Sequence, residues 1–218
     1  MPHKKGKIMV DLMIDFQTFG QDQFTCPIIN CSLFAFEWDR FKVDPYSFEE
    51  IVKNSTTFKV SVKDQVVNHG YSIEESTVNF WEKQTPELRA LIKPKKDDLS
   101  LSDFCKKINT FLSNSEKIDY WWSRNNTFDG VILLNAFKKA GNKNLMGEYL
   151  NTWKVRDIAT HLDTKLDFRQ QNRFIPVKDT EYWESAFQEH NSKHELAADL
   201  MRMQTMFMLE HDMEMLLK

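Results

Sequence analysis

The fold is decided by the stretch KIMVDLMIDFQTFG (residues 7–20), in which an apolar run ends at the polar pair Asp15 and Gln17. A short run of apolar and β-branched residues is typical of a buried strand, and we expect one over residues 7–16. Side chains two apart in a strand point to the same face, so Asp15 and Gln17 project together. Such a pair suits two metal ligands. The plainer interpretation of the pair alone is a strand end whose polar side chains meet water.

The residues that follow predict two more strands and then a change to helical spacing. Strands are expected at residues 24–37 and 57–62, and three strands in succession favour an antiparallel meander. The remaining expected elements are helices at 76–92 (where Pro86 should start a new helix or kink this one) and 101–112, a strand at 118–123, a helix at 128–140, a strand at 152–158 and a helix at 192–217. This order predicts one α/β domain over residues 1–218, with a mixed sheet flanked by helices.

Composition narrows the functional classes. The 218 residues are 41% hydrophobic and 28% charged, as in an ordinary globular protein, and no apolar run approaches the roughly 20 residues that span a bilayer. We therefore expect no membrane insertion. The three cysteines lack metal-site spacing, which indicates free thiols and a cytoplasmic location. A net charge of −3 gives no global attraction to nucleic acid, so a polyanion needs a local site with metal ions or a few cations.

A second polar motif is RNNTFDGVILLNAF (residues 124–137). Asn126 can cap the expected helix, which places Asp129 in the first turn. A carboxylate there also favours the helix dipole, so capping and dipole effects alone could account for Asp129.

The third motif is EHNSKHELAADLMRM (residues 189–203). Ser192 and Glu195 have the spacing of a capping box, which places His194 in the first helical turn. Asp199 follows five residues later, about 140° around the helix, so the two side chains could flank one site in different roles. The spacing HNSKH lacks the glutamate of a zinc-binding HExxH helix and no third ligand is evident, so zinc is not expected.

Together, the three motifs resemble those of the DEDD 3′-5′ exonucleases, in the subgroup whose general base is histidine. More narrowly, the chain is similar to the exonuclease A family of T-even bacteriophages, over residues 8–203 and including FWEKQTPELR and WKVRDI. The resemblance implies an RNase H-like α/β fold and an enzyme that removes nucleotides from the 3′ end of single-stranded DNA in the host cytoplasm. An exoribonuclease of the same fold is the nearest alternative.

The resemblance also implies the roles of individual residues. Asp15, the group at position 17, Asp129 and Asp199 would hold two Mg²⁺ or Mn²⁺ ions, and His194 would act as the general base. The family has Glu where this chain has Gln17. An amide keeps one coordinating oxygen but removes a negative charge that hard cations prefer, so we expect weaker metal binding and slow hydrolysis. A non-catalytic protein that binds 3′ ends is the alternative.

Substrate contacts are expected from Thr18 and Phe19, directly after the metal pair, and from Phe128, directly before Asp129. Trp81 and Gln84 belong to the stretch FWEKQTP, which the resemblance implies to lie near the same cleft. Aromatic residues can stack on a base without demanding a particular sequence. Most aromatic residues of a globular chain are core, however, and Trp81 fits that role as well.

The C-terminal helix presents Leu196, Leu200, Met203 and Phe207 on one face. Packing of this face against the sheet is the favoured interpretation, and a dimer contact is the second. The chain is accordingly expected to be a monomer or a homodimer.

Overall fold

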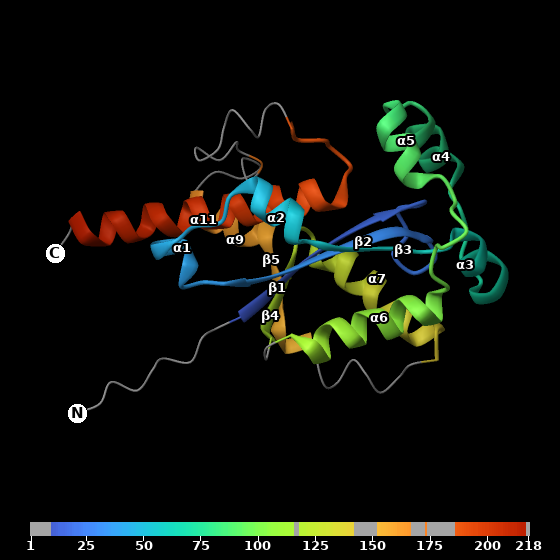
Figure 1. The fold of residues 1–218 in the computed structure, drawn as a ribbon, viewed down its shortest axis with the longest axis horizontal. Coiled ribbons are helices and arrows are strands. Elements are labelled where there is room, and N and C mark those ends of the chain that lie inside the picture. Colours follow the sequence, from blue (N-terminus) through green and yellow to red (C-terminus); the bar gives the residue numbers. More distant parts are fainter. Residues whose placement is uncertain (1–9, 116–117, 142–151, 167–172, 174–185, 217–218) are drawn as a thin grey trace.

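A five-stranded sheet with the strand order β3-β2-β1-β4-β5 lies at the centre of the computed structural model (Figure 1). The structure describes residues 10–115, 118–141, 152–166, 173 and 186–216. Strand β1 (Val10–Thr18) pairs antiparallel with β2 (Ile28–Glu37) and parallel with β4 (Ile118–Ser123). The central position of β1 explains its near-continuous apolar sequence, because helices cover it on both faces.

The two edges of the sheet differ in direction. Strand β3 (Thr56–Lys59) pairs antiparallel with β2, whereas β5 (Val155–Asp157) pairs parallel with β4. The predicted mixed sheet with three antiparallel first strands is therefore confirmed.

The alternation of side chains along β1 divides the core into two layers. Leu12, Ile14 and Phe16 face a cluster that includes α6 (Leu101–Asn114) and α7 (Asn126–Lys139). The opposite face belongs to α11 (Ser192–Leu216), α2 (Phe48–Asn54) and α9 (Ile158–Leu166), which pack around Met13 and Phe34. Asp15 and Gln17 share the face of Met13, so they lie on the α11 side of the sheet.

A pair of short helices, α4 (Glu75–Glu82) and α5 (Pro86–Ile92), stands beyond the sheet and away from both layers (Figure 1). Of the two expected alternatives, Pro86 begins a new helix, α5, rather than kinking one, and the Thr85 side chain caps α5 by accepting from Leu88 N. Trp81 Nε1 donates to Thr18 O at 3.1 Å, which fixes α4 to the last residue of β1. The helix pair is thus positioned by the same strand end that carries the polar pair.

Among the described residues, four helices were not predicted, and the bounds of several expected strands were wrong. The unpredicted helices are α1 (Arg40–Val43), α2, α3 (Val62–His69) and α9. Strand β2 begins at Ile28 rather than at residue 24. The third strand ends at Lys59 rather than at residue 62, because Ser61 caps α3 by accepting from Asp64 N. The expected strand at 152–158 consists of a 3₁₀ turn, Thr152–Lys154, followed by β5, and Ile158 already begins α9. Residues 7–9 of the expected first strand lie outside the described residues.

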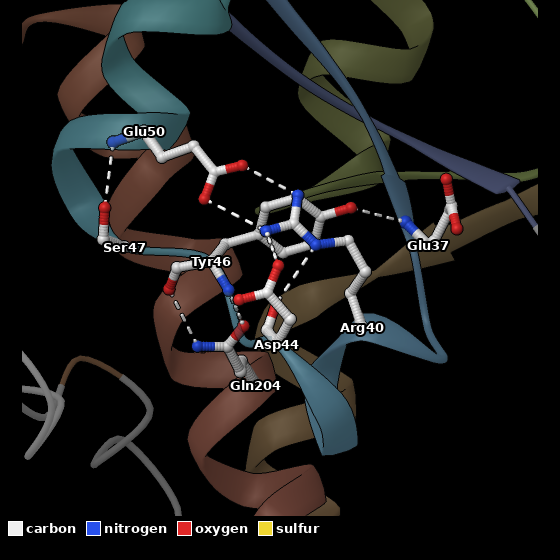
Figure 2. A network of polar contacts seen from close by, with 7 residues as sticks. All are labelled: Glu37, Arg40, Asp44, Tyr46, Ser47, Glu50 and Gln204. Carbon is white, nitrogen blue, oxygen red and sulfur yellow. Dashed lines mark hydrogen bonds and ion pairs between the residues drawn. The ribbon is translucent and has the colours of Figure 1, made fainter.

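Helix α11 is attached to the segment before α2 by a polar network (Figure 2). The Gln204 amide accepts from Tyr46 N at 2.9 Å and donates to Tyr46 O at 3.1 Å. Tyr46 Oη in turn accepts from Glu37 N at the end of β2. These bonds satisfy buried backbone groups, and they set the position of α11 along the sheet.

Burial confirms two expectations about side chains. Leu196, Leu200 and Met203 are at most 1% exposed, so the apolar face of α11 is core. The three cysteines are free and buried. In the part of the chain that the structure describes, no helix combines the length and apolar character needed to cross a membrane.

Candidate active site

Three carboxylates from distant parts of the sequence converge beside the carboxyl end of β1. Asp15 lies on β1, Asp129 lies in the first turn of α7 directly after β4, and Asp199 lies two turns into α11. Strands β1 and β4 are parallel, so their carboxyl ends meet at one edge of the sheet, where ligands bind in open α/β sheets. The three aspartates that the sequence predicted are therefore brought together.

The carboxylate of Asp15 is destabilised by its surroundings. Burial raises the pKa of Asp15 well above its usual value, and the charges of Asp129, Glu195 and Asp199 raise it further. Asp15 keeps some accessible surface, yet dense protein surrounds its oxygens. Repulsion between buried carboxylates is relieved by a shared proton or by a cation, which is the electrostatic pattern of an acid–base or metal site.

Asp129 has the same character and is tied to the same strand. Burial raises the pKa of Asp129 well above its usual value, a hydrogen bond from the Phe16 backbone partly opposes this, and the Asp199 charge adds to it. Phe16 directly follows Asp15, so this backbone hydrogen bond places Asp129 beside β1. Asp129 is only 5% exposed.

The start of α7 is held by Asp157 and not by the cap that the sequence predicted. Asn125, in a left-handed conformation with φ 71°, is the N-cap, so the expected capping role of Asn126 is wrong. Asn126 N instead donates to Asp157 Oδ2 at 2.8 Å, and Asp157 Oδ1 accepts from Thr160 N at 2.7 Å. Asp157 therefore joins the first turns of α7 and α9 and supports the position of Asp129.

The start of α11 lies directly over the strand position opposite Asp15. Ser192 Oγ lies 2.6 Å from Ser32 Oγ, and Ser32 pairs with Asp15 in the β1–β2 register. The expected capping box between Ser192 and Glu195 is wrong, because Glu195 Oε1 accepts from His190 N at 3.1 Å. Glu195 thereby fixes the loop that precedes the helix.

Asp199 is held by two arginines that sequence reasoning missed. Arg124 Nε lies 3.0 Å from both carboxylate oxygens, Arg124 Nη2 lies 2.6 Å from Oδ1, and Arg202 Nη1 lies 2.7 Å from the same oxygen. Burial tends to lower the pKa of Arg124, but the Asp199 carboxylate outweighs this and raises it. The spacing of Asp199 and Arg202 by three residues on a helix was a usable signal for one of the two ion pairs.

Gln17 acts as a hydrogen-bond donor within the acidic group. Its Nε2 donates to Asp15 Oδ2 at 3.1 Å, which stabilises the ionised form of Asp15. Asn30 lies opposite Gln17 on β2 and is 8% exposed. The buried Asn30 Oδ1 has no hydrogen-bond partner among the described residues. An acceptor oxygen thus lies beside Gln17 on the α11 face of the sheet.

His194 lies against an aromatic wall. Its Nδ1 accepts from Gln188 N at 3.0 Å, and its ring packs edge-to-face on Phe48 with centroids 5.5 Å apart. Burial lowers the pKa of His194 below 6.5. Among the residues that the structure describes, no hydrogen bond joins His194 to the three aspartates, and its role as the general base stays a prediction.

The donor chemistry fits a divalent cation at Asp15 and Asp129, which are two closely spaced buried carboxylates that repel each other. Asp199 differs, because its carboxylate is already neutralised by Arg124 and Arg202. Over the described ranges, no three His, Cys, Asp or Glu side chains form a ready set of metal ligands. Among the described contacts, Asp199 Oδ2 accepts only from Arg124 Nε, so a lone pair of this oxygen is left for a cation.

A pocket of about 340 Å³ opens beside the end of β1. It is lined by three of the expected substrate residues, Thr18, Trp81 and Phe128. Trp81 is 3% exposed and bonded to Thr18 O, so it is both a core residue and a wall of this pocket. The two roles that the sequence left open for Trp81 are compatible.

Two other expected substrate residues do not line this pocket. Phe19 lines a different pocket together with Ile29 and Val60, and Gln84 Nε2 donates to Phe80 O at the end of α4. Sequence reasoning missed Phe80 and His190, whose rings meet edge-to-face across the pocket wall with centroids 4.8 Å apart. The only sequence signal for the place of Phe80 in the pocket was its position next to Trp81.

Comparison with known proteins agrees with this architecture. A family model described as "3′-5′ exoribonuclease Rv2179c-like domain" matches residues 10–195. A protein of Enterobacteria phage T4, named exodeoxyribonuclease, is 29% identical over 208 residues that cover 89% of this chain and 88% of the relative.

Solved structures of exonuclease I share the fold. A product-bound structure superposes with a TM-score of 0.58 and 14% identity over 94% of this chain. The E. coli enzyme in complex with a 5cy-dA13 oligonucleotide gives a TM-score of 0.59 with 14% identity, also over 94% of this chain. This chain spans 46% and 43% of those two chains, which is less than half of their length. The predicted RNase H-like fold is confirmed.

Proposed function

The chain belongs to the Rv2179c-like 3′-5′ exoribonuclease domain family and is a DEDD-type 3′-5′ exonuclease, and from this premise we propose that it degrades single-stranded DNA from the 3′ end. The observation that carries the proposal is the convergence of Asp15, Asp129 and Asp199 next to a pocket with aromatic walls. The choice of DNA is supported by the name of the phage T4 relative.

Two divalent cations, Mg²⁺ or Mn²⁺, would be held by Asp15, Gln17, Asp129 and Asp199. When bound, such a pair supplies activation of the attacking water and stabilisation of the leaving oxygen. The protein contributes a site in which carboxylates are already desolvated, so a cation gains more from binding there than at exposed aspartates.

The remaining chemistry falls to neighbouring side chains. His194 would take the proton of the attacking water, and its lowered pKa favours the neutral ring at neutral pH. The lone pair on its Nδ1 accepts from Gln188 N, so this role requires the ring to release that hydrogen bond. Thr18, Trp81 and Phe128 would bind the 3′-terminal nucleotide in the 340 Å³ pocket. Phe19 and Gln84 lie outside this pocket and would contact nucleotides further along the DNA strand. Stacking of a base on an aromatic ring contributes about 1–3 kcal/mol.

Gln17 would make this exonuclease slow. Its amide donates a hydrogen to Asp15, whereas a glutamate would add a negative charge. Fewer negative ligands bind a hard cation more weakly, so at least one ion is expected to have reduced affinity. If this loss of metal affinity were complete, the chain would be a non-catalytic protein that binds 3′ ends.

The test compares the unchanged chain with Gln17→Glu on 5′-labelled DNA and RNA oligonucleotides, with free or blocked 3′ ends, in Mg²⁺ and in Mn²⁺. We expect stepwise shortening of DNA with a free 3′ end, and a rate about 10- to 100-fold higher for Gln17→Glu because a metal ligand regains its charge. Asn114→Asp, which adds the same charge at an exposed position ending α6, is the matched control and should not change the rate.

Each outcome decides a separate part of the proposal. Equal rates for Gln17→Glu and the unchanged chain would remove the charge argument. Cleavage of blocked ends would remove the 3′-end assignment. Faster shortening of RNA than of DNA would favour an exoribonuclease, the second candidate, which the description of the matching family supports.

The number of domains, the oligomeric state and the cellular location belong to the same proposal. A single domain over residues 1–218 is supported by the contacts of α11 with β1, β2, α2 and α9. A monomer is favoured over a homodimer because the apolar face of α11 is buried within the chain, and light scattering would separate the two. A role in the host cytoplasm is supported by the bacteriophage relative and the free thiols.

A further inference from the structure

We propose that Glu195 supplies the fourth carboxylate of the metal site, in place of the one that position 17 lacks. This inference rests on the proposed function, because it assigns a further ligand to the same metal site. It differs from the family pattern, in which the fourth carboxylate stands on the first strand two residues after Asp15.

The docking of α11 places Glu195 over the right part of β1. Ser192, the first residue of the helix, contacts Ser32 through a 2.6 Å hydrogen bond between hydroxyls. Ser32 is the cross-strand partner of Asp15, and directly opposed residues on antiparallel strands lie on the same face of the sheet. Glu195 follows Ser192 by three residues, so it lies on the same side of α11 as the residue that touches the sheet.

Glu195 also shares a helix face with the last aspartate of the site. Residues four apart on a helix are neighbours, so Glu195 and Asp199 project together from α11. The electrostatic effects agree, because the Glu195 charge acts on Asp15 and the Asp199 charge acts on Glu195. The acidic side chains whose charges act on Asp15 thus include Glu195 besides Asp129 and Asp199, although within the described residues these carboxylates do not yet form a ready set of metal ligands.

The geometry at position 17 explains why a replacement is needed. Gln17 uses its amide hydrogen on Asp15 Oδ2, so its role is to orient Asp15. The unpartnered Asn30 Oδ1 beside it offers a neutral acceptor oxygen only. The charge that a divalent pair requires must come from another element, and Glu195 is the acidic residue that α11 places there.

Glu195 is already held in a defined position. Its Oε1 accepts from His190 N at 3.1 Å, which fixes the side chain through the loop before α11. A preoriented carboxylate loses little side-chain freedom when it binds a cation. The same bond gives Glu195 a purely structural role as a loop anchor, so the experiment must separate metal binding from folding.

The experiment titrates Mn²⁺ alone into the full-length protein by isothermal calorimetry. Glu195→Gln keeps the acceptor for His190 N and removes the charge. We expect its Mn²⁺ dissociation constant to rise about tenfold or more, as for loss of a charged ligand. Glu189→Gln, the same change at a side chain 65% exposed on the adjacent loop, should leave the constant unchanged. Glu195→Asp, which keeps the charge, should restore most of the affinity.

The Gln17→Glu background gives the sharper readout. If Glu195 substitutes for a glutamate at position 17, Glu195→Gln should weaken Mn²⁺ binding less in the Gln17→Glu protein than in the unchanged chain. An equal loss in both backgrounds would overturn the inference, as would an unchanged constant for a folded Glu195→Gln protein. Circular dichroism without metal verifies folding, and a loss of structure in Glu195→Gln that Glu195→Asp shares would assign Glu195 to the loop anchor alone.

The variant Asp15→Asn distinguishes failure of the role assigned to Glu195 from failure of the proposed function. Loss of Mn²⁺ binding in Asp15→Asn, together with none in Glu195→Gln, would overturn the role of Glu195 and keep the metal site. Unchanged binding in both variants would overturn the metal site as well.

Discussion

Arg124 and Asp199 form a bidentate ion pair that joins the end of β4 to α11, with Nη2 2.6 Å from Oδ1 and Nε 3.0 Å from both oxygens. The two side chains are 14% and 5% exposed. Both charges are desolvated, so removal of Arg124 leaves the buried Asp199 carboxylate with Arg202 as its remaining arginine partner. The position of Asp199 is therefore set by protein contacts before any cation arrives.

Arg124→Ala should destabilise the metal-free protein by about 3 kcal/mol, because a buried carboxylate loses its main partner although Arg202 remains. Urea unfolding in EDTA measures this. Arg156→Ala is the matched control, since Arg156 lies over the Tyr120 ring and bonds backbone oxygens. A loss for Arg124→Ala no larger than for the control would show that Arg202 alone holds Asp199.

Asp15→Asn should stabilise the metal-free protein at pH 7. The folded-state pKa of Asp15 is raised above the value of 3.8 for a free side chain, so the folded protein binds the proton more tightly than the unfolded chain does. Ionisation of Asp15 therefore removes stability as pH rises above about 4, by about 1.4 kcal/mol for each unit of the raised pKa. Thermal melts in EDTA at pH 4 and pH 7 measure the difference.

The control for Asp15→Asn has the opposite sign. The pKa of Asp22 is lowered by hydrogen bonds from Phe24 N and the Thr25 hydroxyl, so its ionised form stabilises the fold at pH 7. Asp22→Asn should thus lower the melting temperature at pH 7 while Asp15→Asn raises it. A melting temperature that falls in both variants would contradict the repulsion assigned to the buried carboxylates.

His194→Ala, made in the Gln17→Glu background, should lower turnover by about 10²- to 10⁴-fold, the usual effect of a general base. Circular dichroism should be unchanged. Burial lowers the pKa of His194, so in the parent protein the acid limb of the rate should have its midpoint below 6.5 and should vanish in the variant. His69→Ala, on α3, is the control. Near-normal turnover would remove His194 from the mechanism.

Phe80→Ala should raise KM for a DNA oligonucleotide roughly tenfold, with little change in kcat, because stacking on one aromatic ring contributes about 1–3 kcal/mol. Phe80 lines the pocket and is 38% exposed, so folding should be retained. Phe24→Ala removes a ring of the same size that is 58% exposed and does not line this pocket. Equal KM values for the two variants would place the terminal nucleotide elsewhere.

The sequence predicted those parts of the fold that depend on long apolar periodicity. Strands β1, β2 and β4 and helices α6, α7 and α11 follow from the apolar pattern, because each buries a continuous face. The missed helices are short, so their patterns are weak, and tertiary contacts stabilise them. Local signals for two of them were present, since Ser47 and Ser61 each precede an acidic residue by three positions and cap α2 and α3.

The residues of the candidate site also fall into two groups, those that the sequence predicted and those that it did not. The aspartates were found because a motif joins each to a predictable element. Arg124 was missed because its partner lies 75 residues away, a distance over which one sequence carries no contact information. The sequence also did not predict the docking of α11 through Ser32 and Ser192, or the proximity of Glu195 to Asp15 that follows from it.

The three aspartates enter the structure in chain order, from β1, α7 and α11. During translation, a nascent chain therefore carries Asp15 and then Asp129 long before Asp199 exists. The acidic centre can close only after the ribosome has passed codon 199 and α11 has left the exit tunnel. A nascent chain that ends before α11 therefore lacks Asp199 and cannot assemble this acidic centre.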